Sequence, residues 1–305
     1  MMQSGRHGDL SSSERGFVIV AVLWLVAALA ALAVIFSAYL SSSARAIALN
    51  DSALETEALV SAGVELTAYQ LRLPREDARP SQGSFRARLN GSELTVTFLS
   101  EAARVDLNAA PKELLANLLT VLGAAQDDAR QFADRIVGWR TKATPERVGN
   151  EDALYLAAGR SYTPRQAPFA HVNELGLVLG LPPALVERAL PFVTVFSGAP
   201  GVDPLSAPPE VIAALPGMTP LSLKQFLSDR AALPSDPAAI AAALGEAKAL
   251  GTVRKSQAYR LLIRVHLQNG RNTASEVVIS LRSEEDPYRV LSWQDNVSLP
   301  RQTKL

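Results

Sequence analysis

The longest apolar stretch of the chain lies near its N-terminus, at Phe17–Leu40, and contains no charged residue, proline or glycine. A helix rises ~1.5 Å per residue, so a helix of this length spans roughly 36 Å and crosses a hydrocarbon layer ~30 Å thick. The pattern therefore predicts one transmembrane helix over residues 17–40. The alternative is a secretory signal peptide cut near Ala44-Arg45-Ala46, but the apolar core of such a peptide is usually much shorter.

Positive charges near the apolar stretch predict its orientation. Arg6 and Arg15 lie before it, whereas beyond it a lone Arg45 is followed by acidic residues from Asp51 onward. Lys and Arg residues near a membrane helix favour the cytoplasmic side. We therefore expect a cytoplasmic N-terminus, with everything after Leu40 outside the cytoplasm.

Small and apolar residues continue at helical spacing beyond the membrane segment. They are Ala46, Leu49, Ala53, Thr56, Val60, Val64, Thr67 and Leu71. Steps of three and four place them on one helical face. We predict that residues 41–73 continue the same helix as an amphipathic segment, that Pro74 ends it, and that this 46–71 stripe packs on the chain's own sheet.

Period-two alternation of apolar residues surrounds two Asn-Gly pairs, Asn90-Gly91 and Asn269-Gly270. An Asn-Gly pair between alternating segments is the strongest short signal for a β-hairpin. We predict a first hairpin over residues 84–99 and further strands of the same sheet over residues 251–293, followed by a tail at 294–305. The sheet is thus split in the sequence.

Helical spacing dominates residues 100–250, and this region contains a repeat. Residues 105–116 align without gaps with residues 202–213, and Val, Asp, Ala, Pro and Glu coincide. Both copies predict an extended segment followed by a helix that begins at a proline. The second copy continues Leu215-Pro216-Gly217, which resembles part of a helix-hairpin-helix, a module whose turn offers backbone amides to a phosphate. The second glycine of that module is absent.

Composition narrows the function further. Thirty basic and thirty acidic residues cancel, so no global field draws the chain to nucleic acid, and zero cysteines exclude disulfides and thiolate sites. Arg86 and Arg88 share one face of the first hairpin and are expected to be solvated. The three histidines, His7, His171 and His266, lie far apart, and the common hydrolase and phosphate-loop motifs are absent from the sequence. We therefore expect that the protein is not an enzyme and has no catalytic residue.

The residues before the apolar stretch, Glu14-Arg15-Gly16-Phe17, resemble the leader of type IV pilin-like proteins. The resemblance implies that residues 1–16 are a leader, that a prepilin peptidase cuts between Gly16 and Phe17, and that Phe17 becomes N-methylated. Most pilin-like proteins carry Glu as the fifth mature residue, and this chain has Ala21 there. Because a carboxylate in the bilayer needs a partner, its loss indicates a subunit with no neighbour to dock under.

Four further motifs are similar to the general secretion pathway protein K family, the large minor pseudopilins of type II secretion. They are residues 106–111, residues 133–140, Phe169 with Asn173-Glu174-Leu175, and residues 288–293. The resemblance covers nearly the whole mature chain. It implies an α+β fold in which a pilin-like long N-terminal helix packs on an antiparallel sheet, with a large α-helical insertion containing helical-hairpin repeats.

The same resemblance implies the biology. It predicts a single-pass inner-membrane protein with a periplasmic C-terminal part, located at the pseudopilus tip, where it helps initiate pseudopilus assembly and protein export across the outer membrane. The implied partners are other minor pseudopilins, the major pseudopilin, secretion-platform proteins and the prepilin peptidase, with no nucleic acid. The alternative is a membrane-anchored periplasmic DNA-binding protein that uses the helical hairpins.

Calcium is a possible ligand of this chain, because at least one relative in this family binds it. Calcium takes six to eight oxygen ligands, several of them carboxylates. Scattered acids are the weak candidates, namely Glu151, Asp152, Glu284, Glu285 and Asp286. No other cofactor is expected.

Overall fold

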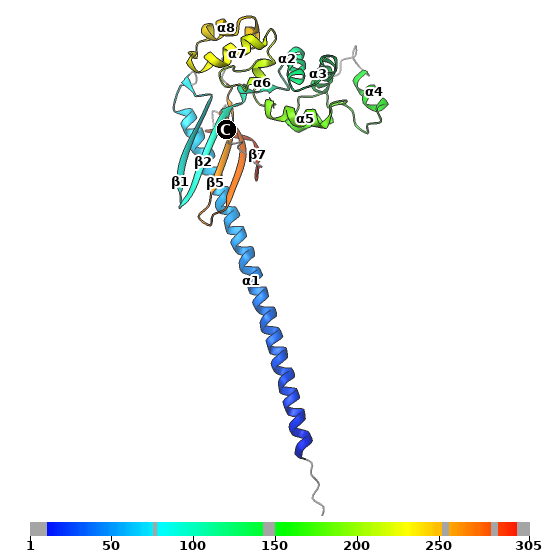
Figure 1. Cartoon of the computed structure of the whole chain (residues 1–305), viewed down its shortest axis with the longest axis vertical. Coiled ribbons are helices and arrows are strands. Elements are labelled where there is room, and N and C mark those ends of the chain that lie inside the picture. The colour runs from blue at the N-terminus through cyan, green and yellow to red at the C-terminus, as the bar shows by residue number, and fades with distance from the viewer. Residues whose placement is uncertain (1–10, 76–77, 143–149, 252–255, 282–285, 298–305) are drawn as a thin grey trace, which may run out of the picture. The chain divides into compact units, whose positions relative to one another are not determined.

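The computed structural model describes residues 11–75, 78–142, 150–251, 256–281 and 286–297. The chain divides into two compact units, Met1–Ala58 and Leu59–Leu305. One helix, α1 (Ser11–Arg72), runs through the first unit and ends in the second (Figure 1).

The described part of the first unit is the N-terminal part of α1. Within it, Ile19–Ser42 is a continuous apolar helix, and none of that window is buried inside the chain. The segment is long and apolar enough to cross a membrane. The helix predicted over residues 17–40 is therefore confirmed as one of membrane-spanning length.

The last turns of α1 pack on the sheet of the second unit. Their buried residues are Leu59, Val60, Gly63, Val64, Thr67, Ala68 and Leu71. Every residue predicted to be buried between positions 60 and 71 is among them, whereas Ala53 belongs to the first unit and is exposed. The predicted 46–71 stripe is therefore confirmed over residues 60–71 and wrong at Ala53, because helical spacing identifies a buried face but not how far a sheet extends along it. The side chains of Ala46 and Leu49 lie outside the described residues.

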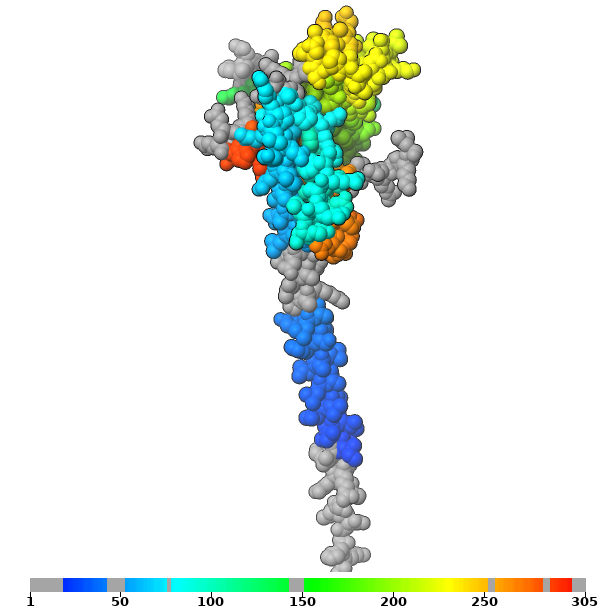
Figure 2. All heavy atoms as spheres, turned by 90° about the vertical axis from the view of Figure 1, so that its left-hand side faces the viewer, coloured from blue at the N-terminus to red at the C-terminus, as the bar shows by residue number. Residues whose placement is uncertain are grey.

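Five strands form an antiparallel sheet in the order β1-β2-β5-β6-β7. Their bounds are Gln82–Leu89, Ser92–Ser100, Ala258–His266, Asn272–Ser280 and Arg289–Gln294. Both hairpins predicted from Asn-Gly pairs are confirmed. Asn90 and Gly91 have φ values of 47° and 77°, as a type I′ turn requires. The side-chain amide of Gln268 donates to the carbonyl of Asn90, so the ends of the two hairpins lie side by side (Figure 2, cyan and orange).

One face of this sheet forms a hydrophobic core with α1. Val96, Ile263 and Val277 point toward the helix and are fully buried. A Cβ atom on Gly63 would lie 3.2 Å from Leu94 Cδ2 and 3.3 Å from Ile263 Cγ2. A glycine at this position therefore permits the close approach of helix and sheet.

The chain between the neighbouring strands β2 and β5, residues 101–257, forms a helical half. Its α-helices are α2 (Lys112–Val121), α3 (Gln126–Arg140), α4 (Asn150–Ala157), α5 (Pro183–Ala189), α6 (Pro209–Ala213), α7 (Pro220–Asp229) and α8 (Pro237–Leu244). Short 3-10 helices occupy Glu101–Ala103, Val172–Leu177, Leu190–Phe192, Arg230–Ala232 and Gly245–Ala249.

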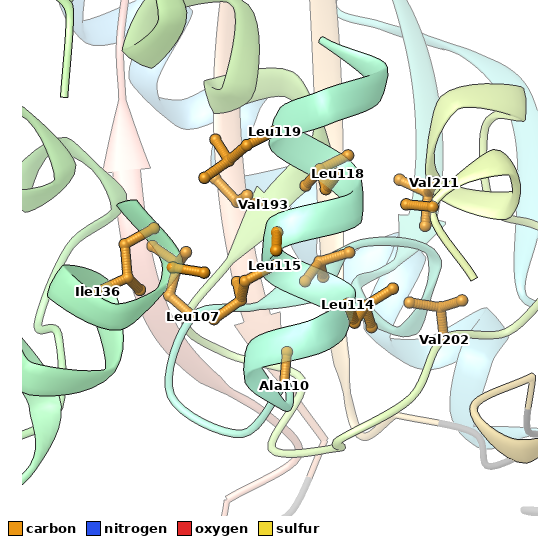
Figure 3. Packing of buried hydrophobic residues seen from close by; sticks show 14 of the residues in the cluster. Leu107, Ala110, Leu114, Leu115, Leu118, Leu119, Ile136, Val193, Val202 and Val211 are labelled. Atoms are coloured by element: carbon orange, nitrogen blue, oxygen red, sulfur yellow. The ribbon is translucent and has the colours of Figure 1, made fainter. Parts of the chain in front are cut away.

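The helical half has a core of its own, separate from the core between α1 and the sheet. The leucines of α2 lie at its centre: Leu115 and Leu119 face Ile136 and Val193, while Leu114 faces Val202 and Val211 (Figure 3). A short parallel pair, β3 (Val105–Asp106) with β4 (Val193–Thr194), crosses this core and was not predicted. Together, the long helix, the antiparallel sheet and the helical half confirm the predicted α+β class.

Candidate functional site

The predicted cleavage bond between Gly16 and Phe17 lies within the helical backbone of α1. Ala21, at the position where pilin-like chains usually carry Glu, lies on the same helix and is exposed. Residues 1–10 of the predicted leader lie outside the described residues. Cleavage and methylation stay predictions.

The calcium candidates do not form a cation site in the described part of the chain. Glu151 Oε1 accepts from Arg135 at 2.7 Å, and Asp152 Oδ1 accepts from the amide of Gln166 at 3.0 Å. Glu151 Oε2 is buried without a hydrogen-bond partner, but calcium requires several such oxygens. Asp286 is exposed; Glu284 and Glu285 lie outside the described residues. Among the described residues, no three acidic or histidine side chains are grouped closely enough to hold a metal.

The described histidines have structural roles. His171 Nδ1 accepts from the backbone N–H of Asn173 at 3.2 Å and thereby caps the 3-10 helix that follows it. The His266 ring contacts the side-chain oxygen of Asn272 on the neighbouring strand at 2.7 Å. His7 lies outside the described residues.

Three of the four motifs that carry the family resemblance lie in the helical half, whereas residues 288–293 lie at β7 of the sheet. Asn108 joins two of them, because its side-chain amide donates to the carbonyl of Phe169 at 3.0 Å and its side-chain oxygen accepts from the Phe169 N–H at 2.7 Å. Arg140, at the end of α3, donates to the carbonyls of Leu107 and Ala110. One motif residue thus holds a distant loop, and another satisfies the carbonyls before α2.

Aromatic side chains fill the space between these motifs. The ring of Trp139 lies 6.0 Å from Phe169 in a stacked arrangement and 6.2 Å from Tyr155. The Trp139 indole N–H donates to Glu174 at 3.1 Å, and the other oxygen of Glu174 accepts from Arg165 at 2.8 Å. Trp139, Phe169 and Glu174, which the sequence singled out separately, therefore belong to one packed network.

The pKa values of two buried groups in this network, Tyr155 and Arg140, shift in the directions that desolvation predicts. Burial raises the pKa of Tyr155 above its usual 10.0, because the phenolate loses its hydration; its hydroxyl oxygen accepts from the Leu179 N–H and partly opposes this change. Burial likewise lowers the pKa of Arg140, and the negative charge of Asp106 acts in the opposite direction.

The two copies of the sequence repeat have equivalent structures. Asp106 accepts from the backbone N–H groups of Asn108 and Ala109, and Asp203 accepts from the N–H of Leu205. The carbonyl that follows is held by an arginine in both copies, since Arg140 binds Ala110 and Arg230 binds the matching Ala207 at 2.7 Å. The repeat is therefore a recurring helix-entry turn that is fixed by an arginine.

This use of Arg230 counts against the DNA-binding alternative. The guanidinium that might have met a phosphate is committed to a carbonyl of its own chain. A Cβ atom on Gly217 would lie 3.2 Å from the Glu246 carbonyl oxygen, so backbone of the same chain packs closely against this turn.

A buried charge cluster joins the helical half to the sheet, and sequence reasoning missed it. Glu101, immediately after β2, is fully buried and accepts from Arg260 Nε at 2.8 Å and Nη2 at 3.2 Å. Arg260 also donates to Glu276 on β6, and the hydroxyl of Thr194 on β4 donates to Glu101. Although burial alone lowers it, the bonds and charges of Glu101 and Glu276 raise the pKa of Arg260 above its ordinary value. Arg260, a charged residue within an apolar strand, was the signal available in the sequence.

The architecture defines a class of protein. The N-terminal part of α1 is a long apolar helix, and the last turns of α1 pack on an antiparallel sheet. A helical half is inserted between two neighbouring strands of that sheet. This is a pilin-like α+β fold with a helical insertion. A family model for type II secretion system protein K matches residues 87–198. This match covers part of the helical half and agrees with the family resemblance seen in the sequence.

Known proteins agree with this assignment. Type II secretion system protein K of Klebsiella pneumoniae is 27% identical over 172 residues, which cover 50% of this chain and 53% of the relative. The matched region therefore spans about half the length of that curated relative. A chain in the crystal structure of the GspK-GspI-GspJ complex from enterotoxigenic Escherichia coli has a TM-score of 0.57 and 19% identity. That match covers 80% of this chain and 95% of the other and shows a shared fold.

Proposed function

We propose that the chain is a minor pseudopilin of a type II secretion system. The observation that carries the proposal is the helical half between β2 and β5, because it places the domain of the protein K family on a pilin-like frame. The Ile19–Ser42 helix supplies the segment that anchors the subunit in the inner membrane and later enters the filament. The N-terminus is cytoplasmic, and the remainder is periplasmic.

The subunit occupies the tip of the pseudopilus, where it helps to initiate assembly and export. Two features support this position. Ala21 replaces the carboxylate that would bind the N-terminus of a neighbouring subunit, and an inserted helical half is bulky for a position within a filament. The work of the protein is therefore done by surfaces, and no catalytic role is part of the proposal.

The partners follow from the same proposal. Other minor pseudopilins bind beside the subunit at the tip, in keeping with the GspK-GspI-GspJ complex of the structural relative. The major pseudopilin adds below, secretion-platform proteins act at the inner membrane, and a prepilin peptidase matures the chain between Gly16 and Phe17.

The deciding experiment is the intact mass and N-terminal sequence of the membrane-extracted protein, made with and without a prepilin peptidase. We expect a chain that begins with methylated Phe17 when the peptidase is present and with Met1 when it is absent. Gly16→Val is the matched variant and should remain uncut. A chain that begins near Ile47, or that retains Met1 beside an active peptidase, would overturn the proposal.

A further inference from the structure

The face of the sheet that points away from α1 carries four arginines on β1 and β5, and three of them, Arg86, Arg88 and Arg264, lie close together near one end of the sheet. Strand register places Arg86 of β1, Thr95 of β2 and Arg264 of β5 directly opposite one another. The next rung contains Arg88, Glu93 and His266. Directly opposed residues of an antiparallel sheet share a face, so Arg86, Arg88 and Arg264 form one surface, here called the arginine face.

The positive charges of the arginine face are only partly offset within the described chain, because Glu93 is the one carboxylate on these two rungs and it lies opposite Arg88. Among the described residues, Arg86, Arg88 and Arg264 form no ion pair, whereas Arg260 on the same face binds Glu101 and Glu276. Strand spacing places Arg86 and Arg264 about 10 Å apart and Arg86 and Arg88 about 7 Å apart. The whole chain is neutral, so this is a local excess of positive charge on a rigid surface.

Protection of a sheet edge does not account for all of these arginines. β1 is an edge strand, and charged side chains on an edge discourage pairing with other chains. That explanation covers Arg86 and Arg88. It does not cover Arg264, because β5 lies between β2 and β6 and exposes no edge.

We propose that the arginine face binds a protein surface on which carboxylates surround a cation. Arginine guanidinium groups pair with carboxylates through two parallel hydrogen bonds, and the hydroxyl of Thr95 adds a donor between Arg86 and Arg264. Glu93 lies between Arg88 and His266, so the partner needs a Lys or Arg at that point. This inference goes beyond the proposed membership of the secretion machinery and does not depend on tip location.

Glu93 is also the reason to favour a protein over a phosphate-bearing partner. Nucleic acid and an anionic membrane present uninterrupted negative charge, which would place a phosphate against the carboxylate of Glu93. A protein surface alternates charges and can match both signs at fixed positions. The occupant is therefore an acidic protein patch with one central basic residue.

The test uses the full chain in neutral detergent at low salt and two labelled peptides, Glu-Glu-Lys-Glu-Glu and the same peptide with Glu in place of Lys. Fluorescence anisotropy should show tighter binding of the Lys-containing peptide, although it carries less negative charge. Arg86→Glu with Arg264→Glu should weaken this binding at least tenfold. The matched control is Arg130→Glu with Arg188→Glu, which changes net charge equally at exposed sites on α3 and α5 and should leave binding unchanged.

Glu93→Lys separates the two partner classes. It should reverse the preference, so that the all-Glu peptide binds more tightly than the Lys-containing one. Stronger binding of the all-Glu peptide by the unmodified chain, or no binding at millimolar peptide, would overturn the proposal. Tighter binding to phosphatidylglycerol vesicles or duplex DNA than to either peptide, further increased by Glu93→Lys, would assign the face to a phosphate-bearing partner instead.

Discussion

Removing the carboxylate of Glu101 should destabilise the second unit strongly. The Glu101 side chain is 0% exposed and that of Arg260 is 13% exposed, so Glu101→Ala leaves a guanidinium mostly buried without its principal partner. Loss of one member of a buried ion pair costs about 3–5 kcal/mol. Glu276 still accepts from Arg260, and its side chain is 25% exposed. We therefore expect the lower end, about 3 kcal/mol of unfolding free energy.

The double variant Glu101→Leu with Arg260→Met tests the cause. Replacing both charged partners with apolar side chains removes the desolvation cost as well as the attraction and is often close to neutral. We expect it to cost about 1 kcal/mol, far less than the sum of the two single variants. Because Glu101→Ala alone should cost about 3 kcal/mol, the coupling between the two positions should then be at least about 2 kcal/mol.

Urea unfolding of the full chain in detergent measures these values. Trp139 reports on the helical half and Trp293 on the sheet, and Trp24→Phe removes the signal from the membrane helix. In the parent chain we expect the two signals to change together. In Glu101→Ala they should separate, because the cluster that joins the sheet to the helical half is lost. A loss below 1 kcal/mol in Glu101→Ala, or a double variant as unstable as the sum, would refute the reasoning.

Three further predictions address the helical half. The raised pKa of Tyr155 means that the folded chain keeps this proton at a pH where the unfolded chain has lost it. The contribution of Tyr155 to the unfolding free energy is therefore complete below about pH 10 and falls as pH rises further. Tyr155→Phe should reduce this alkaline loss of stability in urea titrations repeated at several pH values. Asn108→Ala leaves both backbone groups of Phe169 without their partner and should cost about 2 kcal/mol, seen as faster amide exchange around Phe169 with the sheet unchanged. A Cβ on Gly201 would lie 2.3 Å from a backbone carbonyl oxygen, so Gly201→Ala should lower the unfolding free energy by about 2 kcal/mol. A Cβ on Gly176 would meet nothing within 4 Å, so Gly176→Ala should change the unfolding free energy by less than about 0.5 kcal/mol. Equal effects of the two variants would show that the close contact is not the cause.

The elements that could be predicted from the sequence are those whose signal is local. The Ile19–Ser42 helix needs only an uninterrupted apolar run, and the β1–β2 hairpin needs only alternation around Asn90-Gly91. The repeat was also visible, because its Asp and Pro residues act within a few positions of one another. In each case the residues that fix the structure are neighbours in the chain.

The features that could not be predicted depend on residues far apart in the chain. Val105 pairs with Val193, and Glu101 binds Arg260. In neither pair does the local sequence around one residue indicate its partner. The resemblance to a family grouped Trp139, Phe169 and Glu174 as motifs but did not show that they contact one another. The buried extent of α1 was overestimated for a similar reason, since the sheet sets where the stripe ends.

The position of the helical half has a consequence for the order of folding. Strands β2 and β5 are neighbours, yet Glu101 and Arg260 at their facing ends are separated by 159 positions. Closing a flexible loop of that length costs roughly 4–5 kcal/mol in chain entropy. A helical half that has already formed its own core brings these ends together and removes much of that cost. We expect Trp139 fluorescence to recover before that of Trp293 in stopped-flow refolding, and simultaneous recovery would contradict this order. The helical half, although it is inserted into the pilin-like sheet, should thus fold first and bring β2 and β5 together.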